Sequence, residues 1–93
     1  MIPDFHGPHA GVRTADAESI DWHDPLPRFY RVRVLRHTCE CRTRVYELCA
    51  SSGLAWIRRI ERTPAGVTVK ESHPTSYGKA EELWKKLLSG QAG

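Results

Sequence analysis

The sequence predicts an α+β domain: a four-stranded antiparallel meander with one C-terminal helix packed on one face, preceded by an irregular N-terminal arm. Two patterns support this fold class. Short runs rich in β-branched and aromatic residues alternate between apolar and polar positions, as half-buried strands do. The last run is followed by a segment in which apolar residues recur with the spacing of an amphipathic helix.

The central hairpin is predicted at residues 54–60 and 67–71. The connection at residues 63–66 contains a proline and a glycine, which favour a turn. Because side chains alternate across a strand, Arg58 and Arg59 should point to opposite faces of the sheet. Two further strands and a helix are predicted to pack against this hairpin.

Two runs before the hairpin, residues 29–36 and 44–50, supply the other strands. In the first run, Tyr30, Val32 and Val34 form the apolar side of an alternating pattern. In the second run the alternation slips by one position, which predicts a β-bulge there.

The closing helix is predicted after residue 74, with Thr75 or Ser76 as its N-cap and Gly90 as the residue that follows its last turn. We expect its apolar stripe to lie on the sheet, with Trp84 as the largest contributor. The alternative is that Trp84 and Leu88 form a docking groove or a dimer contact. The stripe consists of Ala80, Leu83, Trp84, Leu87 and Leu88.

The charge of the chain is divided between two segments. Residues 1–27 contain five acidic residues and one basic residue, a net charge of −4, whereas residues 28–93 contain thirteen basic and six acidic residues, a net charge of +7. The first segment lacks both alternation and a helical period, so we predict an acidic irregular arm before a basic domain of strands and helix. Ile20 and Trp22 are the apolar pair able to anchor the arm. We hypothesise that the arm folds over the basic face until a partner displaces it.

The composition also predicts a compartment. No apolar run approaches the roughly 18–20 residues that span a bilayer, and residues 1–6 lack the cationic and apolar parts of a secretory signal. We therefore expect a soluble cytoplasmic protein with no membrane partner, whose three cysteines stay reduced.

Arginines lie within or beside every predicted strand before the turn, with aromatic residues among them. Such a surface can bind phosphates and stack bases, although arginines also prevent exposed sheets from pairing edge to edge. No nucleic-acid-binding motif is present. We therefore predict a small non-enzymatic interaction module with a protein partner, and a nucleic-acid-binding protein as the alternative. The candidate residues for binding an acidic partner or nucleic acid are Arg31, Arg33, Arg44, Arg58 and Arg59, and those for partner or core contact are Trp56 and Trp84.

One group of residues has metal-ligand character: His37, Cys39, Cys41 and Cys49. In an extended strand the side chains of residues i and i+2 lie roughly 7 Å apart, whereas sulfurs that share a zinc ion lie under roughly 4 Å apart. We therefore expect no metal and no cofactor, and keep a zinc-stabilised module as a third interpretation. No serine or cysteine has the surroundings of a catalytic nucleophile, and no phosphate-binding glycine loop is present.

Residues 45–49, the segment from Gly66 to Ser72, and the Trp84-Lys85-Lys86-Leu87-Leu88 segment resemble the small actinobacterial proteins related to BldB, which accompany helix-turn-helix regulators. The resemblance covers about half of the chain. It implies a regulatory or accessory protein that acts through a protein partner, which could be a transcriptional regulator, and that often self-associates. A sheet covered on one face by a single helix also leaves surface open for a homodimer contact.

Overall fold

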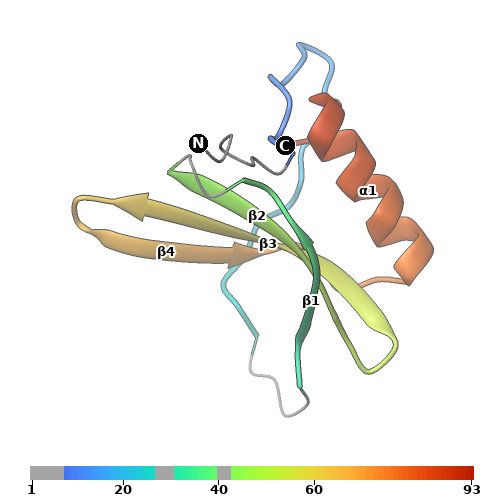
Figure 1. The fold of residues 1–93 in the computed structure, drawn as a ribbon. Coiled ribbons are helices and arrows are strands. Elements are labelled where there is room, and N and C mark those ends of the chain that lie inside the picture. Colours follow the sequence, from blue (N-terminus) through green and yellow to red (C-terminus); the bar gives the residue numbers. More distant parts are fainter. Residues whose placement is uncertain (1–7, 27–30, 40–42) are drawn as a thin grey trace, which may run out of the picture.

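The computed structural model describes residues 8–26, 31–39 and 43–93. Within them, four antiparallel strands form one sheet in sequence order, and a helix lies against one face of the sheet (Figure 1). The predicted α+β meander is therefore confirmed. The elements are β1 (Arg33–His37), β2 (Arg44–Ser51), β3 (Leu54–Thr63), β4 (Gly66–Glu71) and α1 (Tyr77–Ser89).

Tight two-residue turns connect β2 to β3 and β3 to β4. Ser52 and Gly53 have φ angles of 52° and 81°, and two positive φ angles define the hairpin turn that matches the twist of antiparallel strands. In the second turn, the Thr63 hydroxyl donates to the Gly66 carbonyl at 3.0 Å. The predicted turn at residues 63–66 is confirmed.

The β-bulge lies in β1 rather than in residues 44–50, where it was predicted. The register of β1 against β2 shifts between Val34 and Arg36, whereas β2 pairs with β3 residue for residue. The irregular alternation in β2 has another cause: Val45 and Leu48 lie on opposite faces, and both are buried. The first strand also begins at Arg33, later than predicted; Tyr30 lies outside the described residues.

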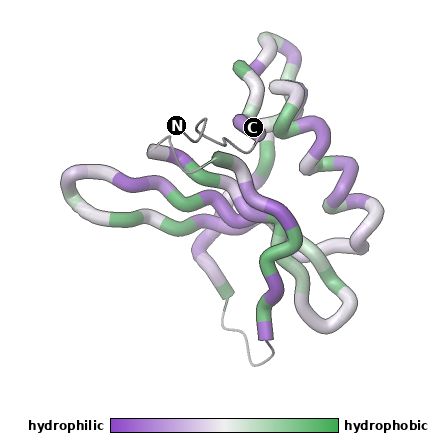
Figure 2. The backbone as a smooth tube through the Cα atoms, in the orientation of Figure 1, coloured by the Kyte–Doolittle hydropathy of each residue, from purple (hydrophilic) through white to green (hydrophobic). Residues whose placement is uncertain are grey.

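Both predicted ends of α1 are confirmed. The Ser76 hydroxyl accepts a hydrogen bond from the Lys79 backbone N–H at 3.3 Å, and Gly90 adopts φ 81°, a left-handed conformation that costs glycine little. Trp84 is 2% exposed and packs in the core beneath the helix. Leu83 and Leu88 are only partly buried. Figure 2 shows hydrophobic and hydrophilic residues interspersed along the strands and the helix.

The described part of the arm, residues 8–26, is irregular, as predicted, but it is docked (Figure 1). Its backbone pairs with the residues after α1: the Thr14 N–H donates to the Gly90 carbonyl at 2.9 Å, and the Glu18 N–H donates to the Gln91 carbonyl at 2.8 Å. Ile20 enters the hydrophobic core, so the predicted anchoring role of this residue is confirmed.

No helix in the described part of the chain has both the length and the apolar character needed to cross a membrane.

Candidate functional site

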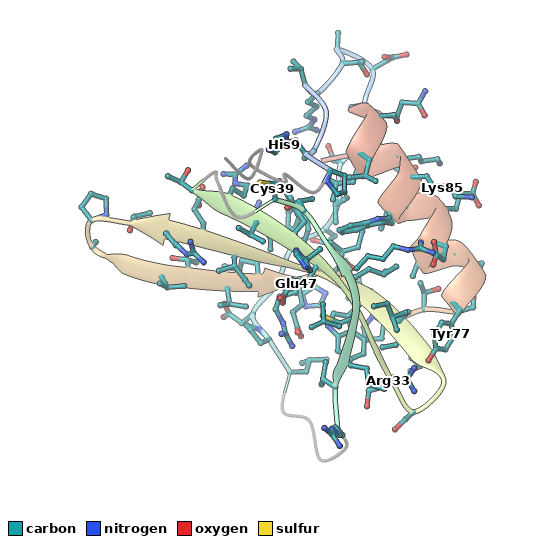
Figure 3. The ribbon with its side chains drawn as sticks, viewed as in Figure 1. His9, Arg33, Cys39, Glu47, Tyr77 and Lys85 are labelled. Carbon is teal, nitrogen blue, oxygen red and sulfur yellow. The ribbon has the colours of Figure 1, made fainter. Side chains whose placement is uncertain are left out.

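The candidate arginines are not gathered on one face of the sheet. Arg31 is exposed before β1, and Arg33 is exposed on β1 beside Ala50, on the face that carries α1. Figure 3 shows Arg33 near the lower end of β1, whereas Cys39 lies beyond the other end of that strand. Arg44 and Arg59 lie on the helix-side face and line the same cavity.

Arg58 points to the opposite face, where carboxylates flank it. In register, Glu47 and Glu71 lie directly across from it on β2 and β4, and its guanidinium contacts their oxygens at 3.2 and 3.5 Å. Burial opposes the charged form of Arg58, but the charges of Cys49, Glu47 and Glu71 outweigh burial and raise the pKa of the guanidinium. Arg58 is therefore held by two carboxylates of the neighbouring strands.

Glu71 contacts several groups on the face of the sheet away from α1. Its side chain is 2% exposed, and its Oε2 accepts a hydrogen bond from the Trp56 Nε1–H at 2.9 Å. The Leu26 backbone N–H donates to Oε1 at 3.3 Å. Buried polar groups need such partners, so Trp56 is a core contact and not a docking residue.

A first cavity, which we call the arm cavity, lies between the arm, the helix-side face of the sheet and the segment after α1. Its volume is about 490 Å³. Trp22 from the arm lies 6.0 Å from the Tyr46 ring, and the Arg59 guanidinium lies 4.8 Å from the centre of the Trp22 ring. Among the residues that line it are Arg13, Ser19, Trp22, Arg44, Tyr46 and Arg59.

Arg44 has a carboxylate partner beside the arm cavity. Its Nε–H donates to Glu61 Oε2 at 3.1 Å. The hydrogen bonding with Glu61 outweighs partial burial and raises the pKa of Arg44, and Arg44 in turn lowers the pKa of the Glu61 carboxyl. Arg44 is therefore fixed in place, but its charge is partly neutralised.

A second cavity, which we call the β1–α1 groove, has a volume of about 520 Å³. Its apolar lining consists of Leu35, Trp84 and Leu88, together with Pro8 of the arm. The sequence pattern indicated either a core role or a docking groove for Trp84 and Leu88. The core role of Trp84 is confirmed, and docking stays a prediction. Trp84 is buried, while Leu88 remains partly exposed. The polar side chains that line the groove are Arg36, His37 and Lys85.

The cysteines give no metal site among the described residues. Cys49 is fully buried, and Cys39 is buried just after β1; Cys41 lies outside the described residues. No three histidine, cysteine, aspartate or glutamate side chains in the described part of the chain lie close enough together to hold a metal ion. His37, Cys39 and Cys49 therefore do not form such a group.

The sequence did not indicate the contribution of the arm to a cavity. Arg13 and Ser19 line the arm cavity, and the Arg13 guanidinium donates to the Ser19 hydroxyl at 2.8 Å. The one available signal was the apolar pair Ile20 and Trp22, which indicated docking but not what the docked arm would enclose.

Comparison with known proteins gives no relative: no family model, no curated protein and no solved structure matches this chain.

Proposed function

We propose that this protein is a small non-enzymatic interaction module that binds a segment of a protein partner in the β1–α1 groove. The segment has apolar side chains flanked by acidic ones. The observation that carries the proposal is an apolar groove with Lys85 exposed at its edge. Arg36 also lines the groove, but Glu81 of α1 pairs with its guanidinium, so Lys85 is the main cation offered to an acidic side chain.

The lining of the groove determines the chemistry of the occupant. Leu35 and Leu88 are partly exposed and offer a surface for apolar side chains, with the buried Trp84 behind them, in the way that grooves bind amphipathic segments. Lys85 is exposed at its edge, and Arg33 lies further along β1 on the same side of the sheet. Cations around an apolar patch favour acidic partners and disfavour basic ones.

The distribution of arginines and rings favours a protein partner over a nucleic acid. A single-stranded platform needs exposed rings beside unpaired cations. Here Tyr46, Trp56 and Trp84 are buried, Arg58 is held by two carboxylates, and Arg44 by one.

The resemblance to the BldB-related proteins predicts that the partner is a transcriptional regulator with a helix-turn-helix domain, and this stays a prediction.

Homodimer formation also stays a prediction. Val67 on β4 and Val34 on β1 are exposed apolar residues of the two edge strands, and a clean monomer in a sizing experiment at high concentration would contradict a dimer.

The proposal is tested by selecting binders to the protein from a displayed library of random peptides. We expect selected sequences to carry aspartate or glutamate beside leucine, phenylalanine or tryptophan. Lys85→Glu should weaken these peptides by about tenfold or less, as expected for one interface charge. Leu88→Ala should weaken them through lost apolar contact.

Lys79→Glu is the matched control, because Lys79 is also an exposed lysine of α1 but does not line the groove. It should leave peptide affinity unchanged. The proposal fails if no peptide is enriched, if basic peptides are enriched, or if the control loses as much affinity as Lys85→Glu. Single-stranded nucleic acid that binds at physiological salt equally well to both variants would favour the alternative function.

A further inference from the structure

We propose that the arm cavity is a binding site for a small organic anion, a phosphate or carboxylate attached to a planar or apolar group. This site is separate from the β1–α1 groove, because the described residues that line one cavity all differ from those that line the other. The inference therefore does not depend on the proposed function.

The charge of the lining indicates an anion. Arg13, Arg44 and Arg59 all line the cavity, and among the described residues no aspartate or glutamate side chain does, although Gly93, the last residue of the sequence, also lines it beside Arg13. Guanidinium groups bind phosphate and carboxylate through paired N–H donors. Among the described residues, no aspartate or glutamate side chain forms an ion pair with Arg13 or Arg59. The Arg13 guanidinium donates to Ser19, and the Arg59 guanidinium lies over the Trp22 ring, near enough to Glu61 for its charge to add to the effect of Arg44 in lowering the pKa of that carboxyl.

The size and the apolar part of the lining indicate an organic ligand rather than a bare ion. A volume of about 490 Å³ lies within the range of roughly 300–1,000 Å³ that is typical of small-molecule sites. Ile20, Trp22, Tyr46 and Leu87 contribute apolar surface to the same space. An anion alone would leave that surface without a contact.

The cavity is lined both by the arm and by the sheet, so a ligand in it should stabilise the docked position of the arm. Arg13, Ser19 and Trp22 come from the arm, whereas Arg44 and Arg59 come from β2 and β3. A ligand that contacts both sets binds only when the arm is docked. It should therefore stabilise the docked arm by mass action.

The experiment titrates the full chain with phenyl phosphate, benzoate, inorganic phosphate and benzylamine, measured by calorimetry and thermal unfolding. We expect phenyl phosphate or benzoate to bind and to raise the unfolding temperature. The tighter of the two identifies the anionic group. Inorganic phosphate should bind about tenfold more weakly or worse, because it makes no apolar contact. Benzylamine should not bind.

Two arginine variants locate the site. Arg59→Gln should weaken binding by about tenfold or more, the loss expected when a charge-assisted contact is removed. Arg62→Gln is the matched control, since Arg62 is an exposed arginine of β3 that does not line the cavity, and it should bind as the wild type does.

The response of the arm provides a third readout. Phenyl phosphate should slow proteolysis within residues 9–24 in the wild type but not in Arg59→Gln. The site is refuted if neither organic anion binds, if benzylamine binds equally well, or if the two arginine variants behave alike. Inorganic phosphate that binds as tightly as phenyl phosphate would overturn the assignment to an organic ligand.

Discussion

Arg58 and Arg59 are adjacent in the chain, yet they lie on opposite faces of the sheet and have different neighbours. Arg58 is flanked by Glu47 and by Glu71, a buried carboxylate. Arg59 lies over the Trp22 ring and lines a cavity with two other arginines. The comparison shows that an arginine with carboxylates directly across from it on the neighbouring strands is paired within the sheet. The positions of the carboxylates, and not the number of arginines, therefore decide which arginines can bind a ligand.

The largest effect on stability should come from the face of the sheet away from α1, which carries Glu71. Glu71→Ala leaves the Arg58 charge without one of its carboxylates and the Trp56 Nε1–H without its acceptor, so it should lower the free energy of unfolding by about 3–5 kcal/mol. Urea unfolding measures this loss. Glu61→Ala, at an exposed ion pair, should change stability little. Equal losses in the two variants would show that the Glu71 network does not hold this face.

The two adjacent arginines should differ in the same assay. Arg58→Gln should cost about 2–3 kcal/mol, because Glu71 stays buried without its ionic partner. Arg59→Gln should cost only about 0.5–1 kcal/mol, the contribution of a cation–π contact near the surface. Calorimetry should show the reverse order for binding phenyl phosphate. If Arg58→Gln abolished binding in a folded protein, the functional division between the faces would be wrong.

A smaller effect is expected where the arm docks. Trp22→Ala removes the ring contacts with Tyr46 and Arg59, which together should stabilise the docked arm by about 1–2 kcal/mol. Limited proteolysis within residues 9–24 should accelerate accordingly. Trp22→Phe keeps a ring at this position, so it should be cleaved at a rate between those of the wild type and Trp22→Ala; cleavage of Trp22→Ala at the wild-type rate would contradict the role of this contact.

The smallest effect concerns pH. The Lys70 ammonium donates to Asp24 at 2.6 Å and holds the pKa of that carboxyl below its ordinary value of 3.8. The pair therefore stabilises the docked arm at pH values above 3.8, and this contribution is lost as the pH falls through the lowered pKa. Proteolysis within residues 9–24 by an acid-active protease should increase over that interval in the wild type. Asp24→Asn should lack this component of the pH dependence.

The sequence was sufficient to predict the elements that depend on local patterns. The strands of the hairpin, the Ser76 and Gly90 caps and the burial of Trp84 follow from alternation, capping preference and helical spacing. The opposite orientations of Arg58 and Arg59 follow from the period of a strand. Each of these features is set by residues close together in the chain.

The features that could not be predicted depend on long-range register. The row formed by Glu47, Arg58 and Glu71 exists only in the observed pairing of three strands. The arm cavity depends on backbone hydrogen bonds between the arm and the segment after Gly90. Backbone groups leave no side-chain signature in a sequence, so neither the row nor the cavity could be read from it.

The most direct test of the division between the two faces is a map of backbone amide chemical shifts during two titrations. One titration uses the selected acidic peptide and the other uses phenyl phosphate. The peptide should perturb the amides of Leu35, Lys85 and Leu88, and phenyl phosphate should perturb those of Trp22 and Arg59. Neither ligand should perturb the side-chain Nε1–H of Trp56, which bonds to Glu71 on the face away from α1. Perturbations centred on β4 or its exposed edge would place binding on the wrong part of the molecule and contradict the account.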